Sequence, residues 1–221
     1  MITLFYDCSF EGFLTCIFEI YAQKYPDARI RKQVTGDCPL WGETILVATD
    51  HKKSARVWEG LKKRSSAEAC HTFYCSFLSE LPDEEDNMLA YLRYTFASAK
   101  DISLDFSTPS VLRVSKVAKM VGREKHRMEA FVRFECMDDK VWCATIEPDF
   151  NVLPLISRHF KNRYADQKWL IADAKRQYAL YYDLNDVMLI EHKKDIKAKT
   201  VGEGEKMYQM LWKKKKKKTN I

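Results

Sequence analysis

The spacing of apolar residues changes along the chain, and this change limits the fold more than any other feature. In the first half apolar residues recur every three or four positions, as on one face of a helix, for example in residues 10–21 and 88–96. In residues 130–136 and 141–146 they alternate with polar residues, as in a strand. The pattern predicts an α+β fold, with a largely helical N-terminal half and an antiparallel sheet with helices in the C-terminal half.

Local signals place the elements expected in the first half. Residues 3–6 favour a short strand, and Ser9 is a suitable cap for the helix that follows. Helical spacing predicts further helices over residues 51–64 and 66–80, and a third after the acidic run Asp83–Asp86. We interpret that run as helix capping rather than metal binding, because negative charge stabilises a helix N-terminus.

The second half begins with a strong helix signal. Thr108-Pro109 joins a capping hydroxyl to a proline at the first helical position, and the helix is expected to end near Gly122. A hairpin turn is expected at residues 138–140, and Asn151 is the predicted cap of a later helix. Three strands joined by short polar turns, a meander, are expected over residues 168–173, 177–182 and 187–191.

These elements divide the chain into three parts. Residues 1–107 form a mainly helical region with short N-terminal strands. Residues 108–212 form an α+β region that contains most of the polar motifs, and the two regions could share one core. Residues 213–221 form a lysine-rich tail, a type of segment that is normally solvated.

Composition excludes several classes of protein. The sequence has no run of about 18 apolar residues and no signal-like N-terminus, so we expect a cytoplasmic protein without membrane contact. The seven cysteines form no C-x-x-C pair and are expected to be reduced thiols. Cys70, His71 and Cys75 lack a second ligand pair, so we expect no metal. Phosphate-loop, dinucleotide and zinc-protease motifs are absent, and we expect no cofactor.

The net charge of +6 is unevenly distributed along the chain. Six consecutive lysines, Lys213–Lys218, account for it, because the remaining chain has 31 basic and 31 acidic residues. Residues 1–110 contain 12 basic and 16 acidic residues, a net of −4, whereas residues 111–182 contain 14 and 9, a net of +5. A surface that binds phosphate would therefore lie in the second half.

Polar groups that could perform chemistry are densest between residues 146 and 183. His159 and Arg163 are four positions apart on a predicted helix and so share a face. A histidine beside a carboxylate and an arginine can act as an acid–base pair, can bind phosphate, or can form a structural network. The sequence leaves these three alternatives open. The catalytic candidates are His126, Glu147 and His159, and the candidates for a polar network are Glu124, Asn151, Asp166 and Gln167.

A basic turn joins two expected strands that are rich in aromatic residues. Lys175 and Arg176 follow Asp173, with Trp169 and Tyr178 on the flanking strands. Single-stranded nucleic acid is often bound by such a combination of cations and rings, although aromatic residues are also common in strands for packing alone. The candidates for nucleic-acid contact are Arg127, Arg163, Lys175, Arg176, Trp169 and Tyr178.

Three segments resemble a family of bacterial proteins of unknown function. They are FYDCSFEGFLTCIFE, EKHRMEAFVRFE and IEPDFNVLPLISRHFKNRYADQKWLIADAKRQYALYYD. The family is described as putative DNA metabolism or DNA repair proteins, typically encoded beside a radical-SAM protein and sometimes fused to a uracil-DNA glycosylase-like domain. Relatives continue past an Asn-Ile pair into a segment rich in Arg, His, Tyr and Trp, whereas this sequence ends at Asn220-Ile221 after the lysines.

The resemblance implies an accessory protein of DNA repair or modification. DNA and a radical-SAM enzyme would be its partners, and the enzyme would supply the chemistry. Two alternatives remain open at this point: a stand-alone hydrolase acting on a DNA base or phosphodiester, and an interaction scaffold without DNA contact. The sequence does not decide whether the chain has activity of its own.

Overall fold

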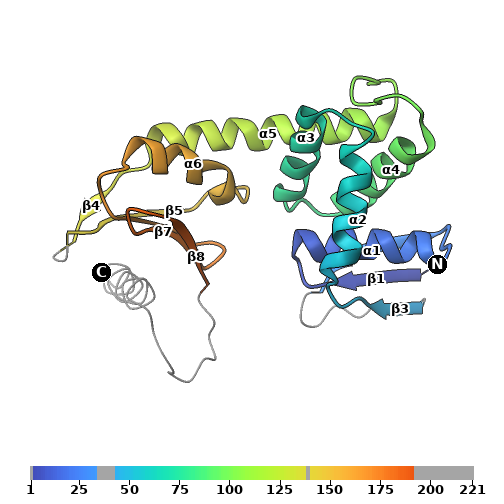
Figure 1. Ribbon diagram of the computed structural model, residues 1–221, viewed down its shortest axis with the longest axis horizontal. Helices are drawn as coiled ribbons and strands as arrows, with labels where there is room; N and C mark the ends of the chain where they lie inside the picture. Colours follow the sequence, from blue (N-terminus) through green and yellow to red (C-terminus); the bar gives the residue numbers. More distant parts are fainter. Residues whose placement is uncertain (1, 34–42, 138–139, 192–221) are drawn as a thin grey trace. The chain divides into compact units, whose positions relative to one another are not determined.

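The computed structural model describes residues 2–33, 43–137 and 140–191 of the chain (Figure 1). The chain divides into two compact units, unit 1 (Met1–Val121) and unit 2 (Gly122–Ile221). Helices dominate the first half, and a five-stranded sheet forms in the second. The predicted α+β class is therefore confirmed.

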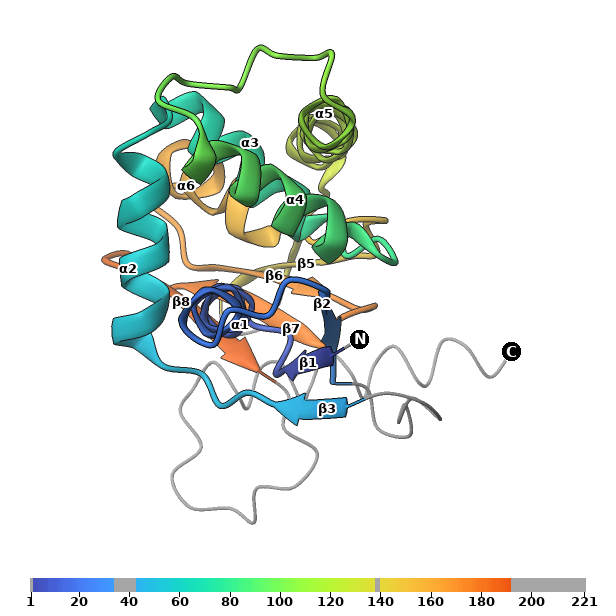
Figure 2. The ribbon, with the colours of Figure 1, turned by 90° about the vertical axis from the view of Figure 1, so that its right-hand side faces the viewer.

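Unit 1 contains a small parallel sheet. Its central strand β1 (Ile2–Tyr6) pairs with β2 (Ala28–Lys32) on one side and with β3 (Glu43–Leu46) on the other. Parallel neighbours need a crossover, and α1 (Phe10–Ala22) supplies it between β1 and β2. Ser9 is the N-cap of α1, as predicted, because its hydroxyl accepts the backbone N–H of Gly12 at 2.9 Å. Figure 2 shows α1 beside this sheet.

Further helices complete the core of unit 1. They are α2 (His51–Lys62), α3 (Ala67–Leu78) and α4 (Glu84–Ala97). The apolar stripe of α1 packs against them, with Phe13 and Phe73 both fully buried and their ring centroids 6.4 Å apart. In the described ranges, no helix is both long and apolar enough to cross a membrane.

The acidic run lies in the first turn of α4, as predicted, but it also makes contacts that the prediction did not include. Asp83 makes no side-chain capping bond, and its φ of 59° is left-handed. Glu84 and Glu85 are buried and bind partners elsewhere in unit 1: Glu84 pairs with Arg113 at 2.9 Å, and Glu85 accepts the hydroxyl of Tyr6 at 3.0 Å. The run therefore fixes α4 to neighbouring elements, because a buried carboxylate is stable only when it is bonded.

Helix α5 (Pro109–Phe131) begins where the sequence predicts but does not end near Gly122. Lys125 and Glu129, four positions apart and 2.9 Å from each other, form an ion pair that favours continuation of the helix. The alternating segment that predicted a strand over residues 130–136 forms only the short strand β4 (Glu135–Cys136).

Unit 2 is built on a five-stranded sheet in the order β4-β5-β6-β7-β8. The last four strands are β5 (Trp142–Ile146), β6 (Trp169–Asp173), β7 (Tyr178–Tyr182) and β8 (Val187–Glu191). The meander β6-β7-β8 is antiparallel, as predicted. The pairing of β5 with β6 is parallel instead, because α6 (Leu153–Arg163) connects them as a crossover helix.

The strand register decides which aromatic residues share a face. Trp169 lies opposite Tyr182, and Ile171 lies opposite Leu180. The alternation within the two strands predicts that one of these sets packs inward. Both sets in fact point to the same buried face, where Phe160 of α6 packs against them. Which side chains share a face depends on the register between the two paired strands, and neither strand's sequence alone fixes that register.

Candidate nucleic-acid interface

The turn between β6 and β7 is held by a buried ion pair. Asp173 is fully buried; one of its carboxylate oxygens accepts the backbone N–H groups of Lys175 and Arg176, at 2.9 and 3.0 Å. The other oxygen accepts Arg176 Nη1 at 2.9 Å. Arg176 also donates to the carbonyl oxygens of Pro148 (3.2 Å) and Asp149 (3.0 Å). The guanidinium predicted to contact nucleic acid is thus engaged within the fold, with its side chain 10% exposed.

The loop after β5, which contains Pro148 and Asp149, is also bonded to residues of α5. The backbone N–H of Asp149 donates to the buried carboxylate of Glu124 at 3.0 Å. Arg127 forms an ion pair with Glu124 and lies 3.3 Å from the Asp149 carboxylate. Lys175 Nζ donates to the Asp149 carbonyl at 3.1 Å, although its side chain is on the surface. Glu124 therefore connects the loop after β5 to α5 through these hydrogen bonds and ion pairs.

Two further predicted residues have different roles from those expected. Asn151 does not cap α6, whose N-cap is Val152; its side-chain oxygen instead accepts the hydroxyl of Tyr178 at 2.5 Å. Trp169 is fully buried and packs against Phe160 and Tyr182. Its ring therefore cannot serve as an open stacking surface on the sheet.

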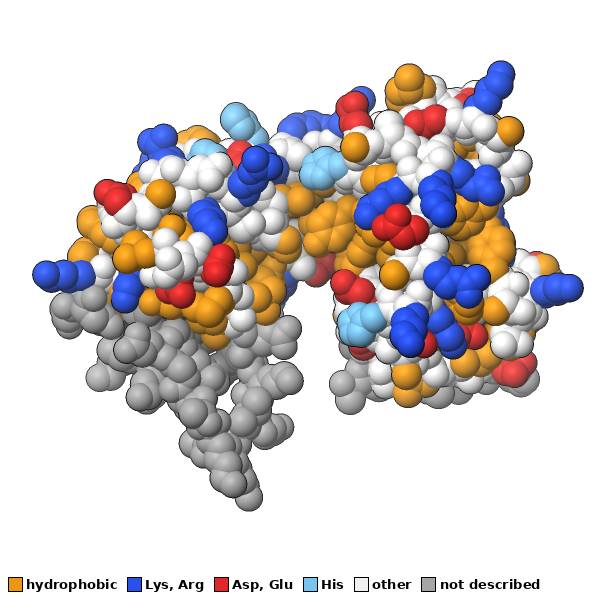
Figure 3. Space-filling model, viewed as in Figure 1, with side chains coloured by type: hydrophobic (Ala, Val, Ile, Leu, Met, Phe, Trp, Pro, Cys, Tyr) orange, Lys and Arg blue, Asp and Glu red, His pale blue; other side chains and the backbone are white. Residues whose placement is uncertain are grey.

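Helix α6 carries two of the exposed arginines of unit 2, Arg158 and Arg163. This helix contains Arg158, His159, Lys161 and Arg163 and no acidic residue. We call Arg158, His159 and Arg163 the α6 basic surface, in which His159 and Arg163 share one face of the helix and Arg158 lies on the adjoining side. Figure 3 shows Lys, Arg and His side chains over this part of unit 2. Both guanidinium groups are exposed, and neither pairs with a carboxylate among the residues that the structure describes. Arg163 lies over the Tyr164 ring, 5.8 Å from its centroid.

The catalytic candidates lie apart on different elements. His126 is exposed on α5, and Glu147 is exposed just after β5. The carboxylate near His159 belongs to Glu129, with His159 Nδ1 3.9 Å from Glu129 Oε1. Asp166 is exposed on the turn after α6. Within the described ranges, no three His, Cys, Asp or Glu side chains are grouped so that they could hold a metal ion.

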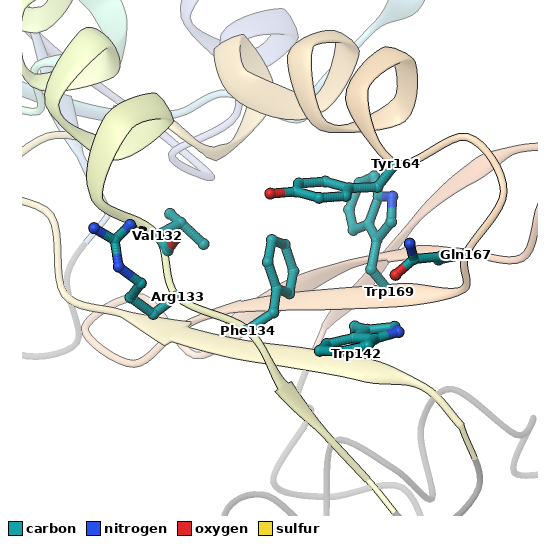
Figure 4. Close-up of a pocket in the computed structure, with 7 residues that line it drawn as sticks. All are labelled: Val132, Arg133, Phe134, Trp142, Tyr164, Gln167 and Trp169. Carbon is teal, nitrogen blue, oxygen red and sulfur yellow. Dashed lines mark hydrogen bonds between the residues drawn. The ribbon is translucent and has the colours of Figure 1, made fainter.

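An aromatic pocket of about 350 Å³ opens in unit 2 (Figure 4). It lies where the segment after α5, the start of β5 and the turn before β6 come together. Its lining residues are Val132, Arg133, Phe134, Trp142, Tyr164, Gln167 and Trp169. Gln167 and Trp169, both predicted as site residues, therefore meet here.

Sequence reasoning missed most of this pocket. Phe134, Trp142 and Tyr164 come from three separate segments, and no local motif joins them. A weak signal was present: Trp142 and Trp169 are each the first residue of a strand, and a helix connects the two strands. The parallel register places them side by side. Arg158 was also missed, although it lies within the same helix as His159 and Arg163.

The fold and site define an α+β protein whose second unit joins a mixed sheet, a basic helix and an aromatic pocket. Residues 82–221, more than half of the chain, match the domain of unknown function DUF4130, so the chain belongs to this family. No curated protein matches it. The chain has a low similarity to the solved structure of PggH, a pGpG-specific phosphodiesterase from Vibrio cholerae. The identity is 12%, the TM-score is 0.35, and the match covers 81% of this chain and 80% of that one. A similarity of this size carries no argument about function.

Proposed function

We propose that this protein binds single-stranded nucleic acid through the α6 basic surface of unit 2. The observation that carries the proposal is the pair of exposed guanidinium groups, Arg158 and Arg163, on a helix without acidic residues. Guanidinium groups bind phosphate oxygens with two parallel hydrogen bonds, and groups without a carboxylate partner are available for this contact. The aromatic residues beside α6 fit a single strand, whose bases are unpaired.

The cellular role that the family resemblance implies is accessory to DNA repair or DNA modification. In this role the nucleic acid is DNA, and a radical-SAM enzyme supplies the reaction while this chain holds the strand. Arg127, Lys175 and Arg176 then position the site, because each already binds Asp149 or Asp173 within the fold.

Fluorescence anisotropy with short single-stranded and double-stranded DNA tests the proposal, in a salt series from about 50 to about 200 mM. The double variant Arg158→Gln/Arg163→Gln should bind more weakly. If each arginine contacts one phosphate, the slope of log K against log salt should flatten by roughly 1.4, at about 0.7 per phosphate for a single strand. The matched control is Arg56→Gln/Arg64→Gln, which removes two exposed arginines from unit 1. The control should leave both affinity and slope unchanged.

The lysine run needs a separate control, because it would bind any polyanion by counterion release. Lys213–Lys218 lie outside the described residues. Each measurement is repeated with all six lysines changed to glutamine in the full-length chain. Binding that persists and still depends on Arg158 and Arg163 supports the proposal. Binding that disappears with the lysines, or that the double variant leaves intact, overturns it.

A further inference from the structure

The aromatic pocket is mostly apolar, with few polar groups. Phe134 and Tyr164 meet edge to face, with ring centroids 5.3 Å apart and an interplanar angle of 70°. Trp142 and Trp169 are neighbours across the parallel strands β5 and β6. Figure 4 shows these four rings around one space, with the Gln167 amide on one side and Arg133 on the other. Aromatic walls with a few placed polar groups are typical of a site for a planar ligand.

One polar group in this pocket has no partner. Trp169 is fully buried, and its indole Nε1 makes no hydrogen bond within the described part of the chain. Buried N–H groups are nearly always bonded, because an unbonded donor loses its hydration without compensation. In Figure 4 the indole nitrogen lies on the Gln167 side of the ring. The Trp169 indole N–H therefore lacks a hydrogen-bond acceptor, and a bound molecule could supply one.

The pocket is open to solvent through its other residues. Trp142 is 37% exposed, and Arg133 is exposed. Tyr164, whose ring lines the pocket, also lies under the guanidinium of Arg163, so the pocket adjoins the α6 basic surface. A strand bound to that surface would have its phosphates on the cations and a base within reach of the pocket.

We infer that the pocket receives one unpaired nucleobase of the bound strand. The base stacks against the exposed face of Trp142, accepts the Trp169 indole N–H at a ring nitrogen or carbonyl, and bonds the Gln167 amide. A volume of about 350 Å³ is at the small end of the usual range for ligand sites, roughly 300–1,000 Å³, which suits one base with its sugar. Unstacked bases are bound in this way, by rings on their faces and polar groups at their edges.

This inference rests on the proposed function but can fail independently of it. The test uses two probes: a mixed-sequence single strand of eight nucleotides that contains all four bases, and an eight-unit strand in which every base is replaced by an abasic sugar. The readout is the ¹H–¹⁵N spectrum of the tryptophan indoles, with the Trp169 signal identified from its loss in Trp169→Phe. The strand with bases should shift the Trp169 indole signal downfield, as expected for a new hydrogen bond, and the abasic strand should not.

Affinity measurements with a variant complete the test. Trp142→Ala should weaken binding of the strand with bases by at least about fivefold, since stacking on one ring contributes that much or more, and should leave the abasic strand unaffected. The control is Phe106→Ala, an aromatic residue of unit 1 that is 44% exposed and far from the pocket in sequence.

The possible outcomes separate the two proposals. If both strands bind equally and the Trp169 signal does not move, the pocket inference is overturned while the α6 basic surface stands. If neither strand binds, both proposals are overturned. If Phe106→Ala weakens binding as much as Trp142→Ala, the affinity loss reflects general loss of aromatic surface, and the pocket inference is again overturned.

Discussion

Replacing Arg176 by alanine should destabilise unit 2 strongly. The change removes the one side chain that neutralises Asp173 within the turn, and the Asp173 carboxylate is fully buried. It also removes the donor to the carbonyl oxygens of Pro148 and Asp149. Among the described residues, the buried charge would then keep only the backbone N–H groups of residues 175 and 176.

The size of the effect follows from these contacts. Removing one partner of a buried ion pair costs about 3–5 kcal/mol, because the remaining charge is left in a poorly solvated site. The two backbone hydrogen bonds that Asp173 keeps reduce this cost, and the loss of two carbonyl contacts adds roughly 1 kcal/mol each. We therefore expect a loss of about 3–5 kcal/mol. The double variant Asp173→Asn/Arg176→Ala should lose less than Arg176→Ala, because it buries no charge.

Hydrogen–deuterium exchange with mass spectrometry can place the loss in unit 2. Amides of β6 and β7 that exchange through opening of the unit should do so roughly 10² to 4 × 10³ times faster in Arg176→Ala. Peptides of β1 and α1 in unit 1 serve as the internal reference. Lys175→Ala is the control; its exposed amine makes one hydrogen bond, to Asp149, and the change should cost less than about 1 kcal/mol.

One result would refute this reasoning about Arg176. In that result, the exchange rate of β6 and β7 amides in Arg176→Ala stays within tenfold of that in the natural chain, while DNA binding falls as far as in Arg158→Gln/Arg163→Gln. Arg176 would then be a contact residue, as the sequence predicted, and not the structural partner of Asp173.

Three further predictions concern single residues. Burial raises the pKa of Asp7, but hydrogen bonds from Ser9 and Thr49 outweigh it and hold that pKa below its usual value. Asp7→Asn should therefore cost about 0.5–1 kcal/mol at neutral pH, and the difference should vanish in acid unfolding curves as pH falls from about 4 through the lowered pKa. Burial raises the pKa of Cys16 to about 12, so iodoacetamide at pH 8 should label exposed Cys136 and spare Cys16 until urea unfolds the chain. Phe160→Ala should destabilise unit 2 by about 3–5 kcal/mol, measured by exchange of β6, and an unchanged exchange rate would contradict its placement in the core.

The sequence by itself determined the class of most elements. Helical spacing with Ser9 as a cap placed α1, and Thr108-Pro109 placed the start of α5. Alternation with short polar turns placed the meander of β6, β7 and β8. These signals succeed because they act within one turn of helix or one strand, where neighbouring residues alone fix the backbone.

The acidic run was decided by contacts between distant parts of the chain. The end of α5 was decided instead by an ion pair between residues four positions apart, a signal weaker than the glycine that indicated a stop. Gly122 suggested a stop, but ion pairs along the next turns support the helix to Phe131. The carboxylates of Glu84 and Glu85 suited a helix N-terminus, yet their partners Arg113 and Tyr6 lie at distant positions in the sequence. Long-range partners override weak local preferences because burial makes an unbonded charge costly.

The candidate site depended most on tertiary structure. The sequence identified His159 and Arg163 as neighbours on one helix, and that pairing needs only helical geometry. Only the fold shows that Arg176 forms an ion pair with buried Asp173, while Arg163 has no carboxylate partner among the described residues. The pocket likewise exists only because the crossover through α6 makes β5 and β6 parallel and sets Trp142 beside Trp169. Residue types record what chemistry is available, but strand pairing and burial decide which groups meet and which remain exposed.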